Sequence, residues 1–294
     1  MKENKIWNDY LPEDMQEHWT VYECLKESED SSTFLVKETV TGILCVLKWG
    51  RNRQAEFLRN EMEIMEKMAD RKLSGIPKTY RIFEENGEVY LVREYIEGMS
   101  LAQMVLQKGG ISEAEICRIS RKICQTAEQF QNPDEPMIHR DIKPENIVVT
   151  PGGEVVFIDF GTMRSYKKDG SRDTFVVGTR GTAAPEQYGY TQTDQRTDVY
   201  AIGQTMLYMV SESYEKNQLS ECAVSRRMKK IIEKACSFEP DKRYGDAAQL
   251  RRAVEKCQAN NRKKVYKKAG AVFGLIAAGY IPVSYTHLRA HETS

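Results

Sequence analysis

Five polar residues in the chain could together perform chemistry on a charged substrate. Lys48 closes the apolar run Cys-Val-Leu-Lys, and Asp141, Lys143 and Asn146 stand close together in the segment His-Arg-Asp-Ile-Lys-Pro-Glu-Asn. Asp159 begins an Asp-Phe-Gly triplet. Carboxylate and amide oxygens are ligands that Mg²⁺ prefers, and a lysine ammonium binds phosphate as a point charge. These residue types suit a reaction on a phosphate group held together with a divalent cation.

The motifs around these residues follow one another in a fixed order. Lys48 comes first, then the eight-residue segment His139–Asn146, the triplet Asp159–Gly161, and the segment Gly178–Glu186, which ends in Ala-Pro-Glu. Over residues 20–258 this series resembles the catalytic core of the protein-kinase superfamily. It is most similar to bacterial Ser/Thr kinases of the eukaryotic-like (Hanks) type, many of which are anchored in a membrane. The resemblance implies an α+β, bilobal fold, with a small β-rich N-lobe that carries one main helix and a larger, mostly α-helical C-lobe.

The resemblance assigns a role in phosphoryl transfer to each of the five residues. Asp141 would accept or orient the proton of the attacking hydroxyl, and Lys143 would meet the γ-phosphate as its charge develops. Lys48 would hold the α- and β-phosphates of ATP. Asn146 and Asp159 would bind Mg²⁺, with Mn²⁺ as an alternative.

Further nucleotide contacts also follow from the resemblance. Glu61, in the segment Asn-Glu-Met-Glu-Ile-Met, would form an ion pair with Lys48; Glu56 and Glu63 are rivals because they lie in the same helical stretch. The remaining nucleotide contacts are assigned to Leu25, Val46, Glu94 and Ile96.

Other family positions in the sequence are interpreted as architecture or regulation. Thr179 would bond to Asp141 and Lys143, Asp198 would brace the catalytic loop, and His139 would pack and form hydrogen bonds within it. Glu186 and Arg243 match a buried ion pair of the family. Arg140 would bind a phosphate on the activation segment, and the candidate acceptors there are Ser165, Ser171, Thr174 and Thr179, with Ser171 and Thr174 favoured.

Two departures from the family pattern bear on function. The phosphate loop, residues 25–33, has Lys26, Ser28 and Ser31 where the family has glycines. We expect the serine hydroxyls to replace some backbone contacts to phosphate, and the nearby acids to repel anions; these acids are Glu27, Glu29 and Asp30.

Arg93 precedes the hinge, Glu94–Ile96, where the family usually has an apolar residue. A buried arginine needs a partner, so Arg93 is expected to reach Glu61 or Glu63, or to turn to solvent.

Apolar patterning places these motifs on a strand-rich segment followed by a helical one. Strands are expected over residues 21–25, 33–38, 44–49, 78–83, 89–95, 147–150 and 155–158. Helices are expected over residues 55–68, 112–131, 199–210, 225–236 and 247–258, with a capping box at Ser112 and Glu115.

Composition limits the class of protein. The 294 residues carry 43 basic and 43 acidic side chains, which gives no case for nucleic-acid binding. The 7 cysteines include no Cys-x-x-Cys pair, so we expect reduced thiols in a cytosolic compartment. The first residues contain no apolar stretch of the kind found in a signal peptide.

The C-terminal residues predict a membrane anchor. The basic run Arg262–Lys268 precedes the apolar run Ala269–Ile281, as at the cytoplasmic flank of a transmembrane helix. A spanning helix needs about 20 residues, so we expect a helix that is cut short, over residues 269–282. Residues 283–294 resemble a translated sequencing adapter and are left out of fold reasoning; the alternative is a genuine polar tail after a short buried helix.

The sequence thus predicts a Ser/Thr protein kinase that transfers the γ-phosphate of ATP to proteins, including itself, on the cytoplasmic side of a cell membrane. Two alternatives stay open: a pseudokinase or scaffold with weak nucleotide binding, and a kinase-like small-molecule phosphotransferase. The expected organisation is an extension over residues 1–20, a kinase domain over 21–258 with lobes over 21–96 and 97–258, and a basic segment over 259–268.

Overall fold

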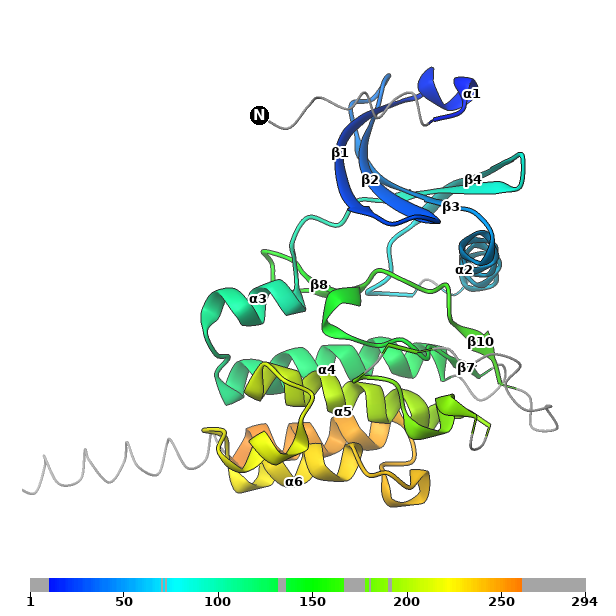
Figure 1. Cartoon of the computed structure of the whole chain (residues 1–294). Coiled ribbons are helices and arrows are strands. Elements are labelled where there is room, and N and C mark those ends of the chain that lie inside the picture. Colours follow the sequence, from blue (N-terminus) through cyan, green and yellow to red (C-terminus); the bar gives the residue numbers. More distant parts are fainter. Residues whose placement is uncertain are drawn as a thin grey trace, which may run out of the picture.

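A twisted antiparallel sheet and a set of packed helices form two lobes, and the chain passes from the first to the second after residue 94 (Figure 1). This α+β arrangement confirms the fold class that the motifs predict. The computed structural model describes residues 11–69, 71, 73–131, 136–166, 178, 179, 181–189 and 192–260.

The N-lobe sheet has the strand order β1-β2-β3-β5-β4, and every neighbouring pair is antiparallel. Successive residues point to opposite faces of a strand, so both faces of this sheet pack. Leu47 and Val92 pack on one face beside Met15 of the short helix α1 (Glu13–Gln16), while Leu91 packs on the other. The strands are β1 (Trp19–Glu27), β2 (Ser31–Glu38), β3 (Leu44–Gly50), β4 (Thr79–Glu85) and β5 (Glu88–Glu94).

Helix α2 (Arg53–Ala69) packs against β3, β4 and β5. Its buried residues recur every three or four positions, as they do on one face of an amphipathic helix. Leu58, Ile64 and Met68 are apolar members of this face, but the buried position between them is occupied by Glu61. A carboxylate is thereby held against the sheet.

The C-lobe is built around α4 (Glu113–Phe130) and α5 (Gln195–Ser211), which pack against each other. Phe130 and the isoleucine side chains of α4 are completely buried in this core. The other helices of the lobe are α3 (Leu101–Lys108), α6 (Arg226–Ala235) and a helix over residues 247–260.

Short strands and turns at the top of the C-lobe carry the catalytic motifs toward the N-lobe (Figure 1). Ile147 pairs with Phe157 in a hairpin, which places residues 146 and 158 side by side. The short strands are β6 (Met99–Ser100), β7 (Met137–Ile138), β8 (Ile147–Val149), β9 (Val155–Phe157) and β10 (Arg164–Ser165). The 3-10 turns of the whole C-lobe are η2 (Pro144–Asn146), which belongs to the catalytic motifs, η3 (Pro185–Tyr188), η4 (Lys216–Ser220) and η5 (Pro240–Lys242).

The predicted strands and long helices are confirmed, with ends that differ by a few residues. Helix α3 was not predicted from the sequence. The capping box at Ser112 forms only in part: the Ser112 hydroxyl accepts the Glu115 N–H at 3.3 Å, but the Glu115 carboxylate accepts from Lys108 at 2.9 Å instead. The seven cysteines all lie in the described part of the chain, and none of them forms a disulfide bond.

Within the described residues, no helix is both long and apolar enough to cross a membrane. The expected membrane helix over residues 269–282 and the expected foreign tail over residues 283–294 lie outside this part of the chain.

Candidate active site

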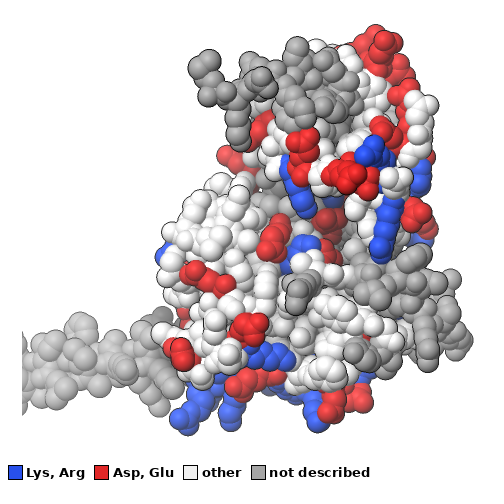
Figure 2. All heavy atoms as spheres, in the orientation of Figure 1, with Lys and Arg blue, Asp and Glu red and all other residues white. Residues whose placement is uncertain are grey.

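A cavity of about 460 Å³ lies between the lobes and brings together residues from the N-lobe sheet, α2 and the catalytic loops. Figure 2 shows basic and acidic side chains interleaved where the two lobes meet. The charged residues that line the cavity are Lys26, Lys48, Arg53, Glu61, Asp141, Lys143 and Asp159. Five of these seven were singled out from the motifs as catalytic or nucleotide-binding residues, and the structure places all five in one space.

The Lys48 ammonium joins three parts of the fold. It donates to both carboxylate oxygens of Glu61, at 2.8 and 3.1 Å, and to Asp159 Oδ1 at 3.3 Å. Burial raises the pKa of Glu61, and Lys48 opposes this effect. The predicted Lys48–Glu61 pair is confirmed, whereas the rival Glu63 is exposed and bonds to Lys67 at 2.6 Å.

Arg93 lies inside the protein behind this ion pair. Its side chain belongs to β5, opposite Val46 of β3, and the residue is only 4% exposed. The buried Nε atom has no hydrogen-bond partner among the described residues. Burial lowers the pKa of Arg93, while the nearby carboxylates of Glu61 and Asp159 raise it. The expectation of a turn to solvent is therefore wrong, and Arg93 supplies positive charge beside Glu61 without a direct bond.

The Asp141 carboxylate is held by three donors. Oδ2 accepts from Lys143 Nζ at 2.7 Å and from Asn146 Nδ2 at 2.9 Å, and Oδ1 accepts from the Thr179 hydroxyl at 2.8 Å. Lys143 also donates to that hydroxyl at 2.6 Å. The bonds expected of Thr179 are confirmed, and they fix the orientation of a carboxylate that can receive a proton from a substrate hydroxyl.

The donor atoms at Asn146 and Asp159 fit a magnesium ion. The Asn146 amide nitrogen is used in bonds to Asp141, so its amide oxygen remains for a cation. Burial works against ionisation of Asp159, but Lys48 and the Gly161 N–H lower its pKa to about 2. No group of three or more His, Cys, Asp or Glu side chains in the described residues could enclose a metal. Mg²⁺ characteristically binds through one or two carboxylates plus phosphates, and this donor set suits such a site.

The phosphate loop is a closed hairpin. The Ser28 N–H and hydroxyl both donate to the Ser31 carbonyl, at 2.8 and 2.9 Å, and the two hydroxyls lie 2.8 Å apart. None of residues 25–33 has a positive φ, so the conformation does not demand glycine. Of the serine hydroxyls expected to replace some backbone contacts to phosphate, that of Ser28 donates to the Ser31 carbonyl, and Ser31 lines the cavity whereas Ser28 does not.

The acids of this loop lie outside the cavity. Asp30 Oδ1 accepts from Arg51 Nε at 2.9 Å and from Asn52 Nδ2 at 3.1 Å, and the Arg51 N–H donates to the Asp30 carbonyl at 3.0 Å. Arg51 also donates to the Glu29 carbonyl at 3.1 Å. The residue after Arg51, Asn52, adopts φ 52°, a left-handed conformation that asparagine tolerates. These contacts fasten the loop tip to the end of β3 and neutralise Asp30, so the expected repulsion by that acid is removed.

Asp198 holds the catalytic loop from below, as expected. Its two carboxylate oxygens accept the backbone N–H groups of His139 and Arg140, each at 3.0 Å. Arg140 has φ 68°, which is costly for a non-glycine residue and needs such bonds to persist. The His139 ring packs among Phe130, Phe157 and Phe160, and burial lowers its pKa to about 4. His139 is thus a neutral packing residue that forms its hydrogen bonds through the backbone.

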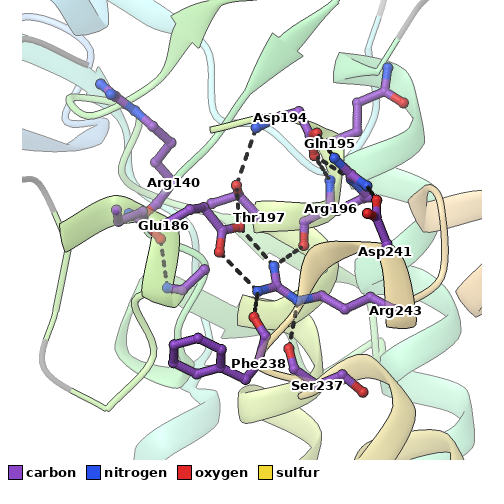
Figure 3. Close-up of polar contacts among 12 residues, drawn as sticks. Arg140, Glu186, Asp194, Gln195, Arg196, Thr197, Ser237, Phe238, Asp241 and Arg243 are labelled. Carbon is purple, nitrogen blue, oxygen red and sulfur yellow. Dashed lines mark hydrogen bonds and ion pairs between the residues drawn. The ribbon is translucent and has the colours of Figure 1, made fainter. Parts of the chain in front are cut away.

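The predicted pair of Glu186 and Arg243 is confirmed as a buried, bidentate ion pair. Arg243 donates to the two carboxylate oxygens at 2.7 and 2.8 Å, and its side chain is 0% exposed. Figure 3 shows its guanidinium surrounded by Glu186 and by the backbone carbonyls of Arg196, Ser237 and Phe238. All five N–H donors of the guanidinium have an acceptor. The pair ties the end of the activation segment, at η3, to the helical lobe.

Four predicted nucleotide contacts do not line the cavity: Leu25, Val46, Glu94 and Ile96. Glu94 instead accepts the Lys78 N–H at 3.0 Å. These four assignments remain predictions that rest on the family resemblance.

Sequence reasoning did not assign roles to Asn60 and Arg53. Asn60 Nδ2 donates to the carbonyls of Gly161 and Met163, at 2.9 and 2.8 Å, and so connects α2 to the segment after Asp159. Its place beside Glu61 in the Asn-Glu-Met-Glu-Ile-Met segment was a usable signal. Arg53, at the first position of α2, had none, because only the fold brings it to the cavity.

Comparison with known proteins agrees with this geometry. The sequence profile of the protein kinase domain matches residues 20–263. The chain is 31% identical over 218 residues to serine/threonine-protein kinase D of Synechocystis sp., which covers 68% of this chain and 42% of that protein. It is 30% identical over 184 residues to serine/threonine-protein kinase PknB of Mycolicibacterium smegmatis, covering 55% of this chain and 29% of that protein. The matched parts span less than half the length of these two relatives.

The buried ion pair predicts a large effect of substitution on stability. We expect Arg243→Met to lower the free energy of unfolding by about 3–5 kcal/mol, because Glu186 would stay buried without a counter-charge. Arg243→Met combined with Glu186→Gln should recover part of this loss. Urea unfolding measures both, with Arg252→Met, an exposed position, as the matched control. A loss for Arg243→Met no greater than that of the control would contradict the role assigned to the pair.

Proposed function

Because the chain belongs to the protein kinase family, we propose that it transfers the γ-phosphate of ATP to serine and threonine hydroxyls of proteins. The observation that carries this proposal is the single cavity that contains both the Lys48–Glu61 pair and the triply bonded Asp141. One of these groups suits phosphate binding and the other suits orientation of a hydroxyl. Phosphoryl transfer depends mainly on such positioning and charge neutralisation.

In this proposal the cationic residues bind phosphate, and the acidic and amide side chains bind the metal ion and the attacking hydroxyl. Lys48 holds the α- and β-phosphates and remains oriented by Glu61. Asp159 and Asn146 would hold Mg²⁺, which bridges the phosphates and neutralises their charge. Asp141 accepts or orients the proton of the attacking hydroxyl. Lys143 Nζ lies 2.7 Å from Asp141 Oδ2, so it would be close to the γ-phosphate when the hydroxyl attacks.

Lys143 also supports the choice of serine and threonine as acceptors. Tyrosine kinases usually lack a lysine at this position of the family motif, and here Lys143 is part of the bonded group with Asp141 and Thr179. The acceptor class therefore rests on the family resemblance together with this contact.

A pseudokinase or scaffold is the second candidate, and the glycine-free loop is the observation that favours it. In the closed hairpin the Ser28 N–H donates to the Ser31 carbonyl and is therefore not offered to phosphate. ATP binding without phosphate transfer by the wild-type chain would select this candidate.

Phosphate transfer should depend on both charged groups. We expect Lys48→Met to retain less than about a tenth of wild-type transfer from ATP and Mg²⁺ to a protein substrate, because the phosphates lose their oriented cation. Asp141→Asn should lose about a hundredfold or more. Incorporation of labelled phosphate measures both, with Lys37→Met, an exposed lysine on β2, as control. Transfer by Lys48→Met close to that of the control would mean that another lysine holds the phosphates.

We further propose that the chain phosphorylates its own activation segment. Arg140 lies next to this segment and donates from Nε to the Thr162 carbonyl at 2.8 Å. The favoured acceptors, Ser171 and Thr174, lie outside the described residues, whereas the Thr179 hydroxyl is engaged with Asp141. Mass spectrometry after incubation with ATP should find phosphate between residues 165 and 174, and none in Asp141→Asn. An active chain with an unmodified segment would refute the proposal.

The membrane link is also a proposal, supported by the basic run Arg262–Lys268 and the apolar run Ala269–Ile281. We expect the whole chain to float with phospholipid vesicles on a density gradient. The double substitution Leu275→Arg and Ile276→Arg should abolish flotation, because two charges in the apolar run are costly in lipid. Equal flotation of both proteins would argue against an anchor at this place.

A further inference from the structure

The phosphate end of the cavity has two cations that the family roles do not use. Lys26 comes from β1 and Arg53 is the first residue of α2, and both side chains line the cavity. Lys48 and Lys143 already bond to carboxylates, whereas Lys26 forms no ion pair with any described residue. The Arg53 guanidinium lies 5.4 Å from the centre of the Phe57 ring, which also lines the cavity.

The register of the sheet places Lys26 in line with the ATP-binding lysine. Lys26 pairs with Thr33 on β2, and Thr33 pairs with Lys48 on β3. Residues at paired positions of adjacent strands point to the same face of a sheet, so the three side chains form a row across three strands. Since neighbouring strands lie about 4.8 Å apart, the two lysine backbones are separated by roughly 10 Å, a distance that the triphosphate of a nucleotide can bridge.

The backbone N–H groups of the loop are poorly placed to bind phosphate as those of a glycine-rich loop do. The Ser28 N–H is used inside the hairpin, and the tip is fastened to Arg51 and Asn52. Each loop residue also carries a Cβ, which keeps the backbone farther from a ligand. A phosphate under this hairpin would meet side chains before it met backbone amides.

We propose that Lys26 and Arg53 bind the phosphate groups of the nucleotide, as side-chain substitutes for the backbone contacts of a glycine-rich loop. This inference rests on the proposed kinase function and adds two binding residues to it. Lys26 approaches from the sheet and Arg53 from the start of α2, on either side of the Ser31–Thr33 stretch that also lines the cavity. Both are charge contacts, and arginine can additionally offer paired donors to phosphate oxygens.

Titration calorimetry of the full chain with ATP, ADP and adenosine, each with Mg²⁺, tests the proposal. We expect Lys26→Met and Arg53→Met each to weaken ATP binding about threefold to tenfold, because each removes one partly solvated charge contact. ADP should be affected less, and adenosine not at all, because it carries no phosphate. Lys26→Arg should retain most of the ATP affinity.

Two exposed residues outside the cavity serve as matched controls, Lys37→Met on β2 and Arg59→Met on α2. ATP affinity of the Lys26 and Arg53 variants within twofold of these controls would overturn the inference. An equal loss for adenosine and ATP would also overturn it, because that loss would reflect damage to the pocket as a whole.

The outcomes separate this inference from the proposed function. A wild-type chain that transfers phosphate while its Lys26 and Arg53 variants bind ATP normally would refute only the inference. A wild-type chain that binds ATP through Lys26 and Arg53 but transfers nothing would refute only the kinase activity.

Discussion

The position of one ammonium group constrains most of this structure. Lys48 contacts a carboxylate from α2 and another from the C-lobe, so the sheet, the helix and the catalytic motifs must all converge on a single atom. Glu61 is 1% exposed, and leaving such a charge without a partner costs several kcal/mol. Lys48, which bonds to both oxygens of this carboxylate, therefore stabilises the burial of this face of α2. In the proposed function the same contact would orient Lys48 toward phosphate, so the packing of the N-lobe would also position this side chain for binding.

The phosphate loop lacks the glycines of the family pattern, and in the inference above its binding role passes to side chains. A hairpin without positive φ values accepts serine and lysine where the family has glycine. Arg51 fastens the tip of the loop, and the hairpin uses the Ser28 N–H for its own hydrogen bond. In this inference, exposed cations attract the phosphate. Salt screens the electrostatic attraction between exposed charges over about 10 Å. Nucleotide binding should depend on ionic strength more than it would in a loop that uses enclosed backbone donors.

The catalytic loop and the fold class could be predicted from sequence because their signals are local. Asp141, Lys143 and Asn146 lie within six residues, and strand and helix periodicity places them in the mostly helical part of the chain, just before two short strands. The Asp30–Arg51 contact joins residues 21 apart through a hairpin register, so their charges alone suggested repulsion of phosphate. Arg53 was missed for the same reason, since its place at the cavity depends on where α2 begins. For Glu61, three glutamates of one helix competed, and only packing against the sheet selects between them.

Arg93 completes the charge balance of the cleft. In the proposed function, Lys48 would contact the phosphates of a bound nucleotide while it stays paired with Glu61, so its positive charge would be shared between them. In a protein with an apolar residue at position 93, the Glu61 carboxylate would then have Lys48 as its sole nearby cation. Here the buried Arg93 guanidinium remains behind it and attracts Glu61 and Asp159 together. Its own burial is tolerable because both carboxylates are close, although its Nε forms no bond to a described residue. The arginine and the two acids thus stabilise one another, and this mutual dependence explains how a charged residue can occupy a position that the family usually fills with an apolar one.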